Sequence, residues 1–310
     1  MNSRIKLKIA DIITKMQSDF ALAQLSEEEK KLEVTERFDN FFYNQERKEE
    51  ISINVEIVDR LPQIKKTKLS FVTYHPEDGS ENWRLLQKGD TYIYKSPLED
   101  KRQLMLVNKT FDKVTAYLLP KKDKGRVWGS TDIIYDFLQV LMINYLAQRS
   151  AGIFTHSIGV KDIDGKGLLF AGKSGAGKTT TAKLWHNQSR AMVLNDDRII
   201  VRKRNGGFFI HGCPWHGEFS DYLNSRIEAA PLKKIFFIHH APKNTARRIS
   251  VKTAFKLLYP ALFPPFWDKG CLENVVSFSQ DLIENVPCYS LGFVNDKKMI
   301  EFVRKIETNL

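Results

Sequence analysis

Short runs of alternating apolar and polar residues fill the chain between residues 51 and 118. Alternation with a period of two is typical of strands that bury one face. Turn-forming segments such as PEDGS (76–80) and KGD (88–90) separate the runs. The expected strands, in chain order, are ISINVEIV, KLSFVTYH, NWRLLQ, TYIYK, RQLMLV and VTAYLL. This pattern predicts a meander of short antiparallel strands.

Helical spacing of apolar residues is expected on both sides of this meander. Residues 1–45 are predicted to be mostly helical, because SEEEKKLEVTERF has early glutamates and apolar residues at helical intervals. Residues 131–150 are predicted to form a buried amphipathic helix, which Ser130 or Thr131 can cap. Charged and amide side chains interrupt that stretch, so it lacks the run of about 20 apolar residues that a membrane span needs.

The pattern of apolar and polar residues changes after about residue 151, where it predicts a strand, a loop, a helix and a strand in succession. Such an order indicates an α/β domain, and the chain as a whole is expected to be α+β. We therefore predict two domains. Residues 1–130 form a β-rich N-terminal domain with a leading helix, and residues 131–310 form the α/β domain.

The stretch GLLFAGKSGAGKTTTAKLW (167–185) contains the phosphate-loop pattern G-x-x-x-x-G-K-[ST]. The loop backbone and the N-terminus of the following helix can hold phosphate oxygens. Lys178 is expected to reach the β- and γ-phosphates of ATP, and the hydroxyl of Thr179 to bind Mg²⁺. A glycine-rich turn without a ligand is the alternative, which the strand before and the helix after make less favourable. The expected nucleotide-binding residues are Gly172, Ser174, Gly175, Ala176, Gly177, Lys178, Thr179 and Thr180.

An acidic pair, Asp196 and Asp197, follows the apolar run AMVL (191–194) and Asn195. The two strands of a βαβ unit end at the same edge of a sheet, so these carboxylates can share a site with the phosphate loop. One carboxylate can hold Mg²⁺ while the other accepts a proton from an attacking hydroxyl. A solvated turn between two strands is the alternative.

His156 is expected on a strand that turns, through DIDGKG, into the strand before the phosphate loop. This position would place the imidazole beside the site. An ordinary core or surface histidine remains an equally good interpretation.

These segments together resemble a known family. His156, a short hairpin, GKSGAGKT and then NDDRIIV are similar to the C-terminal domain of HPr kinase/phosphorylase and to the wider phosphoenolpyruvate carboxykinase-like group of P-loop kinases. CPWHGEF (213–219) and PLKKIFFIHHAPKN (231–244) resemble segments of HPr-kinase-related proteins, some of which phosphorylate a precursor peptide. The glycine-arginine-asparagine signature of true HPr kinases is not found, so the resemblance points to an HPr-kinase-related protein. It covers about residues 151–300.

The resemblance implies a P-loop kinase fold for the C-terminal domain and a role for each site residue. Lys178 contacts the transferred phosphate, and Thr179 and Asp197 bind the metal. Asp196 acts as the general base, and His156 lies near the γ-phosphate. The implied protein is a Mg²⁺-dependent kinase that moves the γ-phosphate of ATP to a hydroxyl of a peptide, a protein or a small molecule. Family members are often homo-oligomers.

Two other functions stay open. An ATPase or nucleotide-dependent switch would release phosphate without an acceptor, although the N-K-x-D motif of GTPases is not found. A scaffold that binds nucleotide only in order to fold would not require both Asp196 and Asp197.

Several further residues are weighed by their spacing alone. CPWHGEFSDYLNSR, with His216 and Glu218, forms either a substrate lip or a structural turn. His239 and His240 point to opposite faces of a strand, so a shared metal is not expected. YPALFPPFW (259–267) is predicted to be a packed connecting loop. The arginines that can stabilise transferred charge are Arg198, Arg226, Arg247 and Arg248, and their spacing does not choose among them.

Composition narrows the partners and the compartment. The net charge is +11, but lysines and arginines are spread along the chain, and the densest run is KKDKG (121–125). A solvated basic surface therefore explains the charge better than a nucleic-acid platform does. The cysteines Cys213, Cys271 and Cys288 show no metal-ligand spacing, and the charged start of the chain does not fit a signal peptide. We expect a cytoplasmic protein whose partners are a nucleoside triphosphate and its acceptor, with neither nucleic acid nor membrane.

Overall fold

The computed structural model describes residues 3–18, 38, 40–74, 79–95, 103–119, 130–217, 219 and 227–306. The chain divides into two compact units, Met1–Tyr145 with Phe266–Lys269, and Leu146–Pro265 with Gly270–Leu310. Most of helix α2 (Ser130–Gln148) thus belongs to the first unit, whereas the division drawn from the sequence assigns it to the second domain. Of the sequence-based expectations, residues 26–37, KKDKG, Glu218 and Arg226 lie outside the described residues.

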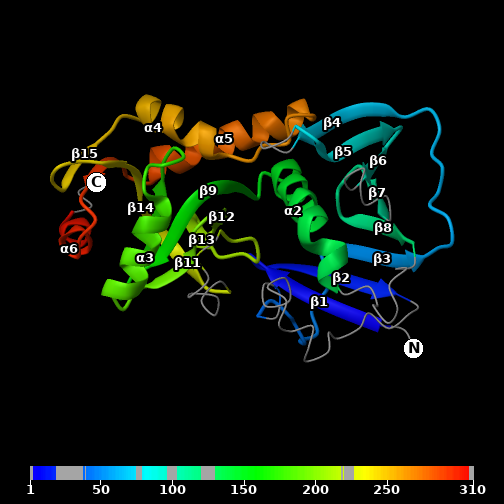
Figure 1. Cartoon of the computed structure of the whole chain (residues 1–310), viewed down its shortest axis with the longest axis horizontal. Coiled ribbons are helices and arrows are strands. Elements are labelled where there is room, and N and C mark those ends of the chain that lie inside the picture. Colours follow the sequence, from blue (N-terminus) through cyan, green and yellow to red (C-terminus); the bar gives the residue numbers. More distant parts are fainter. Residues whose placement is uncertain are drawn as a thin grey trace. The chain divides into compact units, whose positions relative to one another are not determined.

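The first unit contains an eight-stranded sheet with the order β1-β2-β3-β8-β7-β6-β5-β4 (Figure 1). Strands β4 to β8 form the predicted antiparallel meander, since each pairs with the next along the chain. Strand β3 differs from the prediction because it is parallel to both of its neighbours, β2 and β8. The strands are β1 (Ser3–Ile9), β2 (Ile12–Ser18), β3 (Ile51–Ile57), β4 (Lys68–Tyr74), β5 (Glu81–Lys88), β6 (Thr91–Lys95), β7 (Gln103–Asn108) and β8 (Lys113–Leu118).

The predicted leading helix is wrong for the described start of the chain, where β1 and β2 form a hairpin. Ala10 and Asp11 connect the strands with φ angles of 47° and 62°. Two residues in the left-handed region make the tight turn that matches the twist of a hairpin. The alternation of apolar and polar residues favours a strand over a helix here. Leu7 and Ile9 bury one face of β1, while the lysines between and beside them remain accessible.

Helix α2 confirms the predicted buried helix at 131–150. Its Phe137 packs on Tyr94 of β6, with ring centroids 5.2 Å apart. Asn144, one of the residues that interrupt the apolar pattern, is fully buried, and its side-chain oxygen accepts a hydrogen bond from Trp267 Nε1 at 3.1 Å. A buried amide needs such a partner, and this one ties Phe266–Lys269 to the first unit.

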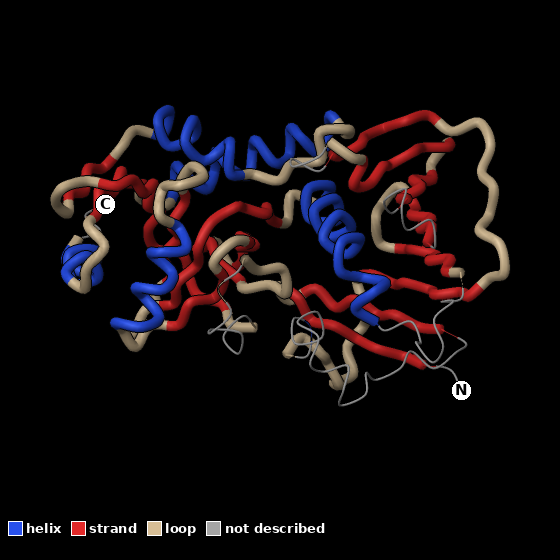
Figure 2. The backbone as a smooth tube through the Cα atoms, in the orientation of Figure 1, coloured by secondary structure: helices blue, strands red, loops and turns tan. Residues whose placement is uncertain are grey.

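The second unit is a mixed α/β structure around a second eight-stranded sheet (Figure 2). Its pairings close a ring, because β10 (Gly167–Ala171) pairs with β9 (Gly152–Lys161) and also with β14 (Ala229–His240). The other strands are β11 (Met192–Asn195), β12 (Arg198–Arg204), β13 (Gly207–His211), β15 (Thr245–Arg248) and β16 (Cys288–Phe293). The helices are α3 (Lys178–Gln188), α4 (Val251–Leu258), α5 (Lys269–Asn285) and α6 (Lys298–Lys305), with a 3₁₀ turn at Tyr259–Ala261.

Helices cover both faces of β10, whose five residues are all buried. Leu169 and Ala171 belong to a core that α5 completes, and Leu168 and Phe170 belong to a second core that α3 and α6 complete. Side chains of a strand alternate between faces, so a strand covered on both sides reads as a continuous apolar run. The sequence GLLFA has this character. Burial on both faces holds β10 in place, and therefore also the start of the loop that follows it.

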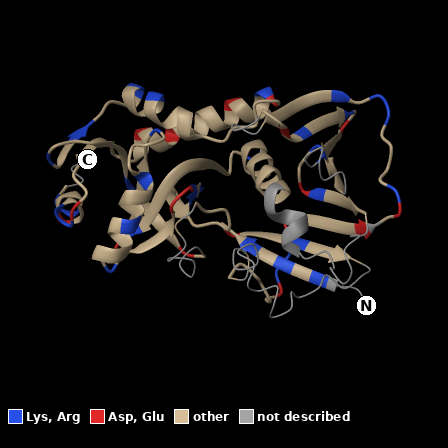
Figure 3. Ribbon diagram, in the orientation of Figure 1, with Lys and Arg blue, Asp and Glu red and all other residues tan. Residues whose placement is uncertain are grey.

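Two expectations from composition have structural counterparts. Lysines and arginines are drawn throughout both units in Figure 3, as their spacing along the chain suggests. All three cysteines are buried and form no disulfide, and burial raises the pKa of the Cys288 thiol to about 12. None of the helices in the described part of the chain is long and apolar enough to cross a membrane.

Candidate functional site

The phosphate-loop pattern lies between β10 and α3, as the sequence predicts. Gly177 precedes α3 with a φ of 92°, and Gly175 has a φ of 76°. A Cβ at Gly172 would lie 2.9 Å from Ala176 Cβ and 3.2 Å from the Ile238 carbonyl oxygen. Only glycine fits these conformations and contacts without strain. The loop therefore needs its glycines for its own shape, before any ligand is considered.

Lys178 folds back over the loop. Its Nζ donates hydrogen bonds to the carbonyl oxygens of Gly172 at 2.9 Å and Lys173 at 3.1 Å. Burial lowers the pKa of Lys178, and the charge of Arg198 adds to that shift while the carboxylate of Asp197 opposes it. Lys178 of the phosphate loop thus lies within electrostatic range of Asp197 and Arg198.

The acidic pair lies in a break between β11 and β12, not at a simple strand end. Both strands pair with the same side of β9. The register shifts within β11, between Val193 and Asn195, and β12 continues the register of Asn195. The Ser157 N–H donates to the Asp197 carbonyl oxygen at 3.2 Å across this break. Irregular positions of this kind re-aim side chains and are frequent beside active sites. Because β10 and β11 both run antiparallel to β9, their C-terminal ends reach the same edge, as expected.

Asp197 is held by two cationic or polar partners. His156 Nε2 lies 2.8 Å from its Oδ1, and Arg198 Nη1 lies 2.5 Å from its Oδ2. Burial alone would raise the pKa of Asp197, but the hydrogen bond from His156 and the charge of Arg198 outweigh it and lower the pKa. The carboxylate is therefore ionised at neutral pH. His156 and Arg198 face each other in register on β9 and β12, which explains their proximity.

Asp196 is only 3% exposed and lies against the turn of CPWHGEF. Its Oδ1 accepts a hydrogen bond from the Gly217 N–H at 2.9 Å. A Cβ at Gly217 would lie 2.6 Å from Asp196 Oδ2, so glycine is needed there. The turn that the sequence offered as a lip or a structural element thus touches one of the two acids.

Asn195 connects the acidic pair to the turn of CPWHGEF, and its spacing in the sequence did not mark it as a site residue. The side chain is fully buried. Its Nδ2 donates to the carbonyl oxygens of Cys213 at 3.0 Å and Trp215 at 2.9 Å, while its Oδ1 accepts from the N–H groups of Asp197 and Arg198, both at 2.9 Å. The sequence signal that could have identified Asn195 is its position, at the end of a buried apolar run and just before two acids.

Among the candidate arginines that the structure describes, Arg198 lies at the acidic pair. Its guanidinium carbon lies 4.4 Å from the ring centroid of Phe263, which is part of YPALFPPFW. The Phe263 N–H donates to the Phe154 carbonyl oxygen at 3.1 Å, so this segment packs on β9 as a connecting loop. Arg247 and Arg248 lie on β15 at the edge of the sheet.

His240 lies beside the phosphate loop, which its place at the end of β14 did not reveal. A Cβ on Gly177 would come within 3.0 Å of His240 Cε1 and 2.7 Å of Phe293 Cζ. His239 contacts the position of Gly292 instead, so the adjacent histidines diverge as expected. Among the residues that the structure describes, no three His, Cys, Asp or Glu side chains are grouped to hold a metal ion.

The steric role of Gly177 can be tested by comparison with Gly175. Gly177→Ala is expected to lower the free energy of unfolding by about 2–4 kcal/mol, because it adds a left-handed alanine and a contact with buried Phe293. Gly175→Ala should cost about 1 kcal/mol, because open space surrounds that position and only the backbone is strained. Urea denaturation measures both variants. Equal losses would show that nothing packs over Gly177.

Parts of the chain are similar to a family model and to solved structures. A family model described as SynChlorMet cassette protein ScmC matches residues 112–261, a segment that includes the phosphate loop and the acidic pair. No curated protein matches the chain. Among solved structures, the HPr(Ser) kinase/phosphatase from Coxiella burnetii is similar, with 9% identity over 49% of this chain and 90% of that chain, and a TM-score of 0.28.

Proposed function

We propose that this protein is a Mg²⁺-dependent kinase of the HPr kinase-like type, which transfers the γ-phosphate of ATP to a hydroxyl group. The observation that carries the proposal is the convergence of two elements. The phosphate loop follows β10 and the acidic pair follows β11, and both strands run antiparallel to β9, so that they end at the same edge.

The phosphate tail of ATP would lie on the loop. Residues 172–180 supply backbone N–H groups and the N-terminus of α3, both of which favour anions. The ammonium of Lys178, now bound to two loop carbonyls, has only to turn toward phosphate oxygens to exchange those partners. Its lowered pKa reflects the cost of holding a charge there, a cost that a phosphate would offset.

The residues present fit a magnesium ion. Thr179 is exposed and offers a hydroxyl oxygen, and Asp197 offers an ionised carboxylate. Both carboxylate oxygens of Asp197 already accept hydrogen bonds, but each oxygen has a second lone pair. Mg²⁺ prefers oxygen ligands and is commonly held by one or two carboxylates together with phosphates and water. When bound, the ion would neutralise charge on the phosphates.

Asp196 is the proposed general base. The hydroxyl oxygen of the acceptor forms a bond to the γ-phosphorus, the bond from that phosphorus to the leaving oxygen of ADP breaks, and the hydroxyl proton moves to the Asp196 carboxylate. The Gly217 N–H fixes the orientation of this carboxylate. Arg198, positioned by Asp197 and Phe263, would stabilise charge on the transferred group, and His156 would orient Asp197.

The acceptor is proposed to be a hydroxyl of a peptide, a protein or a small molecule. We place the reaction in the cytoplasm, where ATP is available and where three buried free cysteines persist. A homo-oligomer remains part of this proposal because of the family resemblance alone.

Phosphate accounting tests the reaction directly. The full-length protein is incubated with γ-labelled ATP and Mg²⁺, first alone and then with an extract or candidate peptides from its own cell. Label is expected to move into an acceptor and to stop moving in Lys178→Ala. Label that appears only as free phosphate, whatever is added, would contradict the kinase and favour an ATPase or switch.

A further inference from the structure

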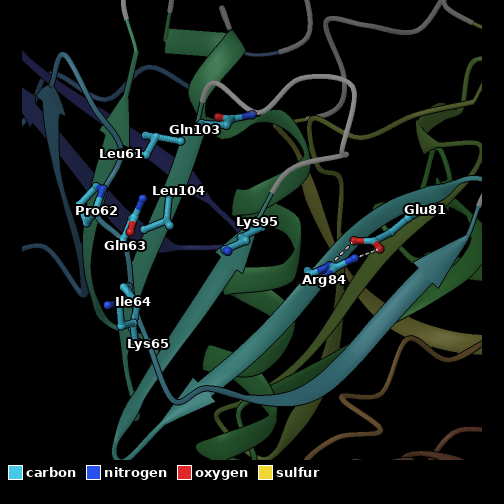
Figure 4. Close-up of a pocket in the computed structure, with 10 residues that line it drawn as sticks. All are labelled: Leu61, Pro62, Gln63, Ile64, Lys65, Glu81, Arg84, Lys95, Gln103 and Leu104. Atoms are coloured by element: carbon cyan, nitrogen blue, oxygen red, sulfur yellow. Dashed lines mark hydrogen bonds and ion pairs between the residues drawn. The ribbon is translucent and has the colours of Figure 1, made fainter.

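The first unit contains a cavity of about 460 Å³ that is distinct from the phosphate-loop site in sequence and in composition. The connection between β3 and β4 forms one wall with Leu61–Lys65, and side chains of β5, β6 and β7 form the other (Figure 4). Pockets that bind small molecules commonly enclose about 300–1,000 Å³. The size of this cavity is therefore suited to a small organic ligand.

The sheet presents a row of three side chains to the cavity. Arg84 pairs with Lys95, and Lys95 pairs with Leu104, so these residues are neighbours across β5, β6 and β7. The adjacent residues Trp83 and Tyr94 point to the opposite face, where their rings pack 5.5 Å apart. The row thus faces away from the aromatic core and toward the Leu61–Lys65 segment.

The positive charges of this cavity are unequally compensated. Arg84 donates two hydrogen bonds to the carboxylate of Glu81, and this bonding lowers the pKa of Glu81. That pair is therefore neutral as a unit. Lys95 and Lys65 have no ion pair with any carboxylate in the described ranges of the chain. Figure 4 shows Lys95 between the Arg84–Glu81 pair and the opposite wall.

The remaining surface of the cavity is mostly apolar. Leu61, Pro62 and Ile64 are half-buried on the connecting segment, and Leu104 is buried on β7. An inorganic anion would pair with the lysines but leave the half-buried side chains of the connecting segment in contact with water. A neutral apolar ligand would cover them but desolvate the lysines without compensation, which costs free energy.

We propose that this cavity binds a small amphipathic carboxylate. The carboxylate pairs with Lys95, with Lys65 nearby on the facing wall, and the apolar body packs on Leu61, Ile64 and Leu104. Arg84 is not the anchor because Glu81 already occupies its guanidinium. This site gives the first unit a ligand of its own, independent of ATP.

Decanoate and decanol are suitable probes, because they share an apolar chain and differ in charge. Isothermal titration of the full-length protein is expected to show saturable binding of decanoate and weaker binding of decanol. Lys95→Gln should weaken decanoate by about fivefold, the effect of one partly exposed charge pair, and leave decanol unchanged. The matched control is Lys88→Gln, which removes an exposed lysine of β5 outside the cavity and should change neither affinity.

A second variant tests the apolar wall. Ile64→Ser lies on a connecting segment and should weaken both probes without unfolding the protein. The proposal is overturned if decanoate does not saturate, or if it binds no more tightly than decanol. It is also overturned if Lys88→Gln weakens decanoate as much as Lys95→Gln, since general attraction to the net charge of +11 would then explain the binding. If a short acidic peptide displaces decanoate at a lower concentration than decanoate itself needs to bind, the proposal of a small ligand is also overturned, and a peptide is the ligand instead.

Discussion

Asp196→Asn is expected to lower the rate of phosphate transfer to an acceptor by about 10²–10⁴-fold, the usual contribution of a general base. The asparagine keeps an oxygen that can accept the Gly217 N–H, so the turn beside it should retain its place. ATP should still bind, because the phosphate loop is unchanged. The measurement combines transfer of labelled phosphate with nucleotide titration, both on the purified full-length variant.

The control for this prediction is Asp164→Asn. Asp164 is a half-exposed acid in the turn between β9 and β10, where it pairs with Lys166, so its loss should leave transfer within about twofold. If Asp196→Asn retains full transfer, Asp196 is not the base. If the variant loses ATP binding as well as transfer, Asp196 supports the phosphate loop or the metal instead.

Asn195→Ala is expected to lower the free energy of unfolding by about 3–4 kcal/mol, because it leaves several buried polar groups without their partner. The affected groups are the carbonyls of Cys213 and Trp215 and the N–H groups of Asp197 and Arg198. Since the same bonds position the acidic pair, transfer should fall even where the variant remains folded. Urea denaturation gives the stability, and labelled transfer at low temperature gives the activity.

Asn285→Ala is the matched control for Asn195. Its side chain also donates to a backbone carbonyl, that of Asp281 at 2.8 Å, but it is exposed on the last turn of α5. Water can replace that bond, so the loss should stay near 0.5 kcal/mol, in the range of surface substitutions. Similar losses in the two variants would show that burial of Asn195 does not decide its contribution.

Local patterns predicted much of the fold. The alternation of ISINVEIV and the five runs after it marks the strands β3 to β8, and the apolar spacing of 131–150 marks α2. The phosphate-loop pattern marks the passage from β10 to α3, because its glycines are required by the backbone itself. Each of these signals arises from residues a few positions apart, so the sequence alone is sufficient to read them.

The start of the chain was predicted wrongly because the pattern of a neighbouring segment was extended over it. SRIKLKI and IITKMQS alternate as strands do, but the glutamate-rich segment that follows them suggested a helix for the whole of residues 1–45. Burial of Leu7, Ile9 and Ile12 within the sheet decides in favour of the hairpin. The parallel pairing of β3 with β2 and β8 likewise depends on partners far along the chain.

The sequence by itself determined where the phosphate-loop pattern lies and which carboxylates follow it in the chain. Only the tertiary structure decided how they meet. It brought His156 to Asp197, brought His240 to Gly177, and gave Asn195 two partners that are 18 and 20 residues away. The physical reason is that spacing constrains a side chain only within its own turn or strand. Contacts between distant segments follow from sheet register and burial, which no local pattern encodes.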